Sequence, residues 1–305
     1  MKRRTAFQLI GASVMGAVSA PAESEAAAPK TAQDPYGCLV DTTLCVGCRE
    51  CEKACNRANE LPPQQTGFSD PSVFEEARRP DEDHFTVVNR YAGAPSPDQE
   101  AREDTYVKVQ CMHCQDPSCV SACIVGALQK TSEGPVIYDE DRCIGCRYCM
   151  VACPFQIPAY EYEDPLAPRV RKCSLCFDNR TDASEPPACV KACPREAIVF
   201  GKREDLLTLA RKKIEDNPAR YNEHIYGEHE VGGTSWLYLT GRPHEELGLL
   251  PLPENAPPRL TESIQHGIFQ YGLPPLALYG ALGGIMWATN RKDNQHEETS
   301  TEDQE

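Results

Sequence analysis

The sequence has no excess of positive charge and no motif for covalent haem attachment. Its 305 residues include 31 Lys and Arg against 46 Asp and Glu, which gives a formal net charge of −15. Nucleic-acid backbones are bound by clustered Lys and Arg, so this balance excludes a nucleic-acid-binding protein. No C-x-x-C is followed by His, which excludes a c-type haem. The length allows one large or two modest domains.

Cysteine, in contrast, is abundant, with 17 residues. The count is odd and the chain is too long for a small disulfide-stapled scaffold, so metal binding is the better interpretation. Sixteen of the cysteines fall into four runs: Cys45, Cys48, Cys51, Cys55; Cys111, Cys114, Cys119, Cys123; Cys143, Cys146, Cys149, Cys153; and Cys173, Cys176, Cys189, Cys193. Cys38 is left over and is expected to pack as a small apolar side chain rather than to bind metal.

The spacing within these runs predicts the kind of metal centre. The first and third runs have the C-x2-C-x2-C-x3-C spacing of bacterial 4Fe–4S ferredoxins, and a proline follows the last cysteine of the third and fourth runs. Three thiolates on one tight loop can bind three irons of a cubane, while the fourth reaches the neighbouring cluster. Structural zinc sites use two C-x2-C pairs that are further apart in sequence, so zinc is the weaker alternative. The sequence therefore predicts four 4Fe–4S clusters.

The expected fold class is α+β, with two bacterial-ferredoxin-like double-cluster modules in one cysteine-rich domain over residues 38–202. Residues 57–104 form a polar insertion, apart from one strand, which either packs against a partner or is solvated. Short strands are predicted at 84–90, 105–110, 135–138, 197–200 and 236–239, with single helical turns after each third cysteine. In a C-terminal extension over 203–262, Leu206, Leu207, Ala210 and Ile214 share one face of a predicted helix.

The N-terminus has the layout of an export signal over residues 1–28. Lys2, Arg3 and Arg4 precede a mostly small and apolar run. Twin arginines indicate the pathway that exports folded proteins, which suits a protein loaded with cofactors in the cytoplasm. Cleavage fits after Ala20 or after Ala26, and an uncleaved basic anchor is the alternative.

The C-terminal region predicts one transmembrane helix over 263–290. Residues 267–290 are 24 residues without a charge, a length that spans about 36 Å as a helix. Arg291 and Lys292 follow at once, so the positive-inside rule puts the tail over 291–305 in the cytoplasm and the cysteine-rich body outside. Pro274 and Pro275 leave a re-entrant or surface-lying segment as the alternative.

The order of the four runs, with a stretched spacing in the last, resembles the four-cluster ferredoxin-like electron-transfer subunits of membrane-bound oxidoreductases. The resemblance covers residues 41–201. More narrowly, DTTLCVGC at 41–48, QCMHC at 110–114 and IYGEHEVGGTSWLYLTG at 225–241 are similar to the ferredoxin-type subunit of hydrogenase-2, a periplasmic quinone-reducing nickel–iron hydrogenase.

The resemblance implies four ligand sets in which the fourth cysteine of each run belongs to a neighbouring cluster. We name each set by its first residue. The outer pair is the Cys45 set (Cys45, Cys48, Cys51, Cys193) and the Cys173 set (Cys173, Cys176, Cys189, Cys55); the inner pair is the Cys111 set (Cys111, Cys114, Cys119, Cys153) and the Cys143 set (Cys143, Cys146, Cys149, Cys123).

Three further residues stand close to predicted ligands. His113 lies between two of them and either tunes its cluster or simply packs at the cluster edge. Arg147 and Lys172 adjoin ligands and could offset cluster charge, although such residues are more often solvated.

The implied function is electron transfer rather than catalysis, and no catalytic side chain is expected. The resemblance implies that electrons pass from the small and large subunits of a periplasmic nickel–iron hydrogenase to a polytopic quinone-reactive membrane subunit. The chain would lie on the periplasmic side of the bacterial inner membrane. The alternative is the same role in a molybdopterin oxidoreductase of the formate dehydrogenase, polysulfide reductase or dimethyl sulfoxide reductase type. An enzyme with an open iron would need a three-cysteine cluster, whereas all four runs are complete.

Overall fold

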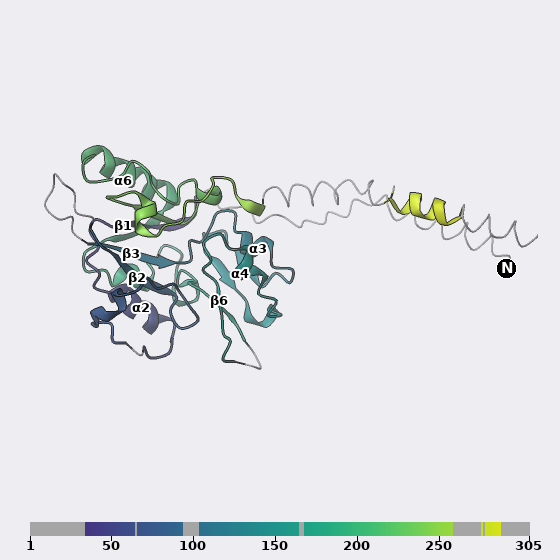
Figure 1. Ribbon diagram of the computed structural model, residues 1–305, viewed down its shortest axis with the longest axis horizontal. Helices are drawn as coiled ribbons and strands as arrows, with labels where there is room; N and C mark the ends of the chain where they lie inside the picture. Colours follow the sequence, from purple (N-terminus) through teal and green to yellow (C-terminus); the bar gives the residue numbers. More distant parts are fainter. Residues whose placement is uncertain are drawn as a thin grey trace, which may run out of the picture. The chain divides into compact units, whose positions relative to one another are not determined.

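In a computed structural model, the described residues are 34–64, 66–93, 104–164, 168–258, 276 and 278–287 (Figure 1). The predicted export signal and the predicted cytoplasmic tail lie outside these ranges, as does most of the predicted membrane helix. Residues 276 and 278–287 of that segment are helical, with exposed side chains. No helix within the described ranges combines the length and the apolar character needed to cross a bilayer.

A three-stranded sheet joins the start of the cysteine-rich region to its end. Strand β1 (Tyr36–Asp41) lies in the centre, antiparallel to β8 (Ile198–Lys202) and parallel to β9 (Trp236–Leu239). Helix α6 (Arg203–Asp216) covers this sheet, and its predicted apolar face packs against Leu39 and Leu237. The extension after residue 202 is therefore part of the same body as the cysteine runs.

The close packing of β1 against β9 leaves no room for a side chain at Gly37. A Cβ atom there would lie 2.3 Å from the backbone oxygen of Ser235, whereas a Cβ atom at Gly67 would meet nothing within 4 Å. We expect Gly37→Ala to destabilise the protein by about 1–3 kcal/mol because the two strands must separate. Thermal unfolding should show a lower midpoint for Gly37→Ala and an unchanged one for Gly67→Ala; equal midpoints would contradict the tight packing.

A second sheet has two strands, one of which belongs to the predicted insertion over 57–104. Strand β2 (Thr86–Tyr91) pairs antiparallel with β3 (Thr105–Gln110), and most of β2 is buried. The carboxylate of Glu52 on helix α2 (Glu50–Ala58) accepts hydrogen bonds from the Val88 N–H at 2.6 Å and from Arg78 Nη2 at 2.7 Å. Glu52 is also paired with Arg49 at 2.9 Å. These contacts tie residues 78–88 of the predicted insertion to the first cysteine run.

The region around the second and third cysteine runs, which we call the inner half, is built from short elements. They surround a small core of Leu128, Val136 and Val170. The hairpins of the inner half are β4 (Leu128–Lys130) with β5 (Val136–Tyr138), and β6 (Ala159–Tyr160) with β7 (Val170–Arg171). Three short α-helices of the described body are α3 (Ser118–Ser121), α4 (Tyr148–Ala152) and α5 (Ala188–Lys191). Single 3-10 turns lie at Pro71–Phe74, Glu140–Arg142, Phe177–Asn179, Glu230–Gly232 and His244–Leu247.

The cysteine-bearing helices pack in two pairs. Helix α2 contacts α5, and α3 contacts α4; in Figure 1, α3 and α4 lie together, away from α2. The first pair joins the first run to the fourth and the second pair joins the second run to the third. The five predicted strands are confirmed, with the predicted bounds for β3 and β9. Helix α2 is longer than the single turn predicted, and β1 was not predicted.

Candidate iron–sulfur sites

The loops of the first and third cysteine runs share one backbone conformation. Gly47 and Gly145 have φ values of 69° and 68°, and Arg49 and Arg147 both have φ of 59°. A side chain at Gly47 would collide with the ring of Tyr106, which explains the glycine. In such turns, successive backbone N–H groups point into a common concavity that favours anions. The N–H of Gly145 points to Cys143 Sγ at 3.4 Å, and in the fourth run the N–H of Leu175 points to Cys173 Sγ at 3.3 Å.

Each predicted ligand set of the outer pair lines one cavity. One cavity is lined by all four cysteines of the Cys45 set, and another by all four of the Cys173 set. In both, three cysteines come from one run and the fourth from the run at the other end of the cysteine-rich region. The packing of α2 against α5 produces this exchange, since Cys55 lies in α2 and Cys193 comes just after α5.

The members of the inner sets also lie close enough to act on one another's charge. Burial raises the pKa of the Cys114 thiol well above its usual range, and the neighbouring Cys111, Cys119 and Cys153 raise it further. Burial likewise raises the pKa of Cys149 to about 11, together with Cys123, Cys143 and Cys146. Cys149 also raises the pKa of Cys119, so the two predicted inner sets lie close to each other.

The chemistry of these thiols suits a multinuclear iron centre. Burial, with neighbouring thiols, raises the pKa of Cys173 to about 12 and that of Cys119 to about 12, so four ionised thiolates require a cation among them. Within the described residues, no three His, Cys, Asp or Glu side chains converge on the position of a single metal ion. A zinc ion needs all its sulfur ligands about 2.3 Å away, whereas a cubane binds each thiolate through a separate iron. Four cysteine thiols around one cavity are the donor set that a 4Fe–4S cubane uses.

Iron retention should consequently depend on pH. Because the pKa values of these thiols are raised, the metal-free sites hold protons throughout the neutral range, and iron binding must displace them. Protons compete better as pH falls, so we expect a fixed concentration of chelator to remove iron faster at pH 6 than at pH 8. Anaerobic absorbance at a series of pH values measures this, and a rate that does not change with pH would contradict it.

Two buried donors lack acceptors in the described part of the chain. Trp236 Nε1 has no hydrogen-bond partner there, and Trp236 lines the cavity of the Cys173 set. His113 Nδ1 accepts the Val136 N–H at 2.9 Å, so its proton is on Nε2, which likewise has no partner there. Burial, with the charges of Lys172 and Lys130, holds the pKa of His113 well below its usual range, so the ring is neutral. Cluster sulfur accepts such N–H groups, so these residues fit the predicted cofactor.

Lys172 and Arg147, the two cations beside predicted ligands, differ in their exposure to solvent. Lys172 is only 5% exposed, and its ammonium donates to the backbone oxygens of Val136 and Cys173; hydrogen bonds inside the protein replace water there. Arg147 is exposed, and its guanidinium lies over the rings of Tyr160 and Tyr162. Cys38 is fully buried in β1 among apolar residues, as predicted.

Lys108 was not singled out by the sequence, although it lies among the outer ligands. It is 2% exposed on β3 and lines both outer cavities. A lysine within a strand ordinarily indicates a solvated face, and no neighbouring residue in the sequence marks this one as buried.

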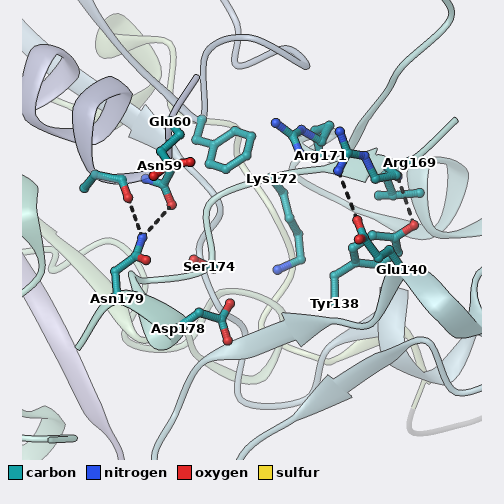
Figure 2. A pocket seen from close by; sticks show the side chains of 13 residues that line it. Asn59, Glu60, Tyr138, Glu140, Arg169, Arg171, Lys172, Ser174, Asp178 and Asn179 are labelled. Carbon is teal, nitrogen blue, oxygen red and sulfur yellow. Dashed lines mark hydrogen bonds and ion pairs between the residues drawn. The ribbon is translucent and has the colours of Figure 1, made fainter. Parts of the chain in front are cut away.

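A separate open pocket is lined by residues at the end of α2, from β5 and β7, and from the loop that follows β7 (Figure 2). Asn59 and Asn179, which follow cysteines of the first and fourth runs, border it, and the Asn179 amide donates to the Ala58 carbonyl and to the side-chain oxygen of Asn59. Arg169, bonded to Glu140 at 3.1 Å, borders it from the inner half. None of the described cysteines lines this pocket, so it is distinct from the ligand sets.

Comparisons with known proteins agree with this geometry. The family profile described as "4Fe-4S dicluster domain" matches residues 103–203. The hydrogenase-2 operon protein HybA of Escherichia coli O157:H7 is 37% identical over 94% of each chain. The formate dehydrogenase-O iron-sulfur subunit of Escherichia coli K12 is 35% identical over 81% of this chain and 79% of its own length. A protein of Nitratidesulfovibrio vulgaris is 45% identical over 83% of this chain and 70% of its own.

Proposed function

Since this chain belongs to the ferredoxin-like iron–sulfur electron-transfer subunits of oxidoreductase complexes, we propose that it relays electrons through four 4Fe–4S clusters between a nickel–iron hydrogenase and a quinone-reactive membrane subunit. The observation that supports the proposal most directly is that two groups of four cysteines, which match two of the predicted ligand sets, each line a cavity of their own. The chain is an electron-transfer subunit and not the catalytic one.

Each cluster, when bound, supplies a one-electron carrier. The chain's residues hold the clusters in a fixed series, exclude water and aim N–H groups at their sulfur atoms. Backbone donors at Gly145 and Leu175 and the side-chain donors of Trp236 and His113 have this role. No proton transfer by a side chain is required.

The two ends of the relay are proposed to lie at exposed cysteines. Cys48 of the Cys45 set and Cys146 of the Cys143 set are both exposed. Large apolar side chains in the same loops are also exposed. They are Val46, two residues before Cys48, and Ile144 and Tyr148, two residues on either side of Cys146. Exposed apolar groups of this kind mark protein contact surfaces. One partner would dock at each of these positions and exchange electrons with the nearest cluster.

We further propose that the chain is exported by its twin-arginine segment and held on the periplasmic side of the inner membrane by residues 263–290. The uncharged run and the following Arg291 and Lys292 support this topology. Replacement of Arg3 and Arg4 by lysine should retain the protein in the cytoplasm, as measured by protease protection in spheroplasts. Unchanged export would contradict the proposal.

The nature of the catalytic partner can be tested by metal analysis. We expect the tagged chain, purified anaerobically from detergent-solubilised membranes, to bring nickel with it, to contain at least about sixteen irons together with sulfide, and to be reduced by hydrogen. The match to HybA over nearly the whole of both chains favours this partner. Molybdenum, with reduction by formate, would instead support the alternative suggested by the formate dehydrogenase-O subunit. Zinc without sulfide would overturn both.

A further inference from the structure

Lys108 forms part of the wall between the two outer cavities. Its Nζ atom lies 2.7 Å from Thr86 Oγ1 and 2.8 Å from Gln110 Oε1, and 4.5 Å from the centre of the Trp236 ring. The residue borders the cavity of the Cys45 set and that of the Cys173 set. No other residue is shared by these two lining groups, which makes Lys108 the common neighbour of both ligand sets within the described chain.

A closed ring of hydrogen bonds fixes the ammonium group in this position. Gln110 accepts from Lys108 Nζ and donates through Nε2 to the Tyr238 hydroxyl at 2.7 Å. The Tyr238 hydroxyl donates in turn to the backbone oxygen of Lys108, also at 2.7 Å. Thr86 donates its hydroxyl proton to the Val109 carbonyl, so its oxygen is oriented to accept from the ammonium. All of these side chains are buried.

The charge of Lys108 has no carboxylate partner among the described residues. Its side-chain hydrogen-bond acceptors are a neutral hydroxyl and a neutral amide. Burial of an ammonium without an anion is unfavourable and ordinarily lowers its pKa. The cysteines that line the two cavities beside it, among them Cys51, Cys173 and Cys189, are the groups that carry negative charge when they bind iron. The anions that balance this cation are therefore the outer ligand sets.

We propose that Lys108 is the shared counter-charge of the two outer clusters and raises the reduction potential of both. The proposal rests on the cluster assignment made above. Each one-electron reduction adds one negative charge to a cluster, and a fixed cation beside it stabilises that reduced form more than the oxidised form. The electron comes from the neighbouring redox partner. No bond forms or breaks, and no proton moves.

Redox titration monitored by EPR tests this in the full complex. We expect Lys108→Met to shift two of the four centres to lower potential and to leave the other two unchanged, with iron and sulfide contents as in the unaltered complex. Four unchanged potentials would overturn the proposal, as would a shift confined to the other two centres. If the unaltered complex does not contain four reducible centres, the proposed function itself fails, which is a separate result.

Two variants of the residues that hold Lys108 separate charge from packing. Gln110→Glu places an anion against the ammonium, so it should shift the same two centres in the same direction without removing the lysine. Gln110→Glu carries the test alone if Lys108→Met does not assemble its clusters. Thr86→Val is the matched comparison, because it removes one acceptor of the ammonium but adds no charge, and it should shift the potentials less than Gln110→Glu does. Equal shifts in Gln110→Glu and Thr86→Val would assign the effect to packing and overturn the proposal.

Discussion

Replacement of Cys55 by alanine is expected to abolish the cluster of the Cys173 set and to leave that of the Cys45 set intact. Cys55 follows Cys51 closely in the sequence, yet it lines the cavity of Cys173, Cys176 and Cys189. Alanine offers no ligand to iron, so this cluster loses one of its four thiolates. We expect the loss of about four of sixteen irons and of one EPR signal.

Paired variants make the exchange of ligands directly visible. Cys55→Ala and Cys176→Ala should lose the same EPR signal, and Cys193→Ala and Cys48→Ala should lose the other outer signal. If each run instead held its own cluster, Cys55→Ala would share its missing signal with Cys48→Ala. The control is Cys38→Ala, which changes a buried cysteine in β1 that lines neither cavity and should keep all four signals.

Removal of the Glu52 carboxylate is expected to be the most destabilising change outside the ligand sets. Both of its oxygens are used by Arg49, Arg78 and the Val88 N–H, and the side chain is only 2% exposed. In Glu52→Ala, the buried Arg49 loses its partner and the Val88 N–H loses its acceptor. Breaking a buried pair in this way costs about 3–5 kcal/mol, so we expect a large drop in the unfolding midpoint of the anaerobic protein.

The position of Glu52 also predicts where the damage appears. Arg78 and Val88 belong to the segment between the first two cysteine runs, so limited proteolysis should cut Glu52→Ala within residues 57–104 well before the unaltered protein. Glu50→Ala on the same helix is the matched control, since its pair with Lys53 is half exposed and contributes less than about 1 kcal/mol. Equal proteolysis and stability in the two variants would show that Glu52 does not anchor the segment.

The features that the sequence predicted best are those encoded by local spacing. The cysteine runs mark their loops through fixed intervals, β3 alternates polar and apolar residues, and β9 is a short apolar stretch. The periodicity of Leu206, Leu207 and Ala210 predicts the buried face of α6 because that helix packs on one side only. The grouping into ligand sets followed from the resemblance to a known family, not from spacing alone.

Features that depend on distant partners were missed or misread. Strand β1 is short, and its role is set by β8 and β9, which follow more than 150 residues later. Lys108 and Lys172 are charged residues that ordinarily indicate solvent, yet both are buried. Their burial is created by the cysteine loops that pack around them, and no local pattern in a single sequence records that kind of environment.

The central position of β1 sets an order for biosynthesis. Its partners at Ile198–Lys202 and Trp236–Leu239 emerge from the ribosome long after β1 itself, so the three-stranded sheet closes only when nearly the whole body has been made. Contacts of such long range form late and slowly. The inner ligand sets, by contrast, are complete once residue 153 has been synthesised. In the proposed arrangement, maturation therefore proceeds from the middle of the chain outwards, and a truncated product would retain the inner pair of sites and lack the outer one.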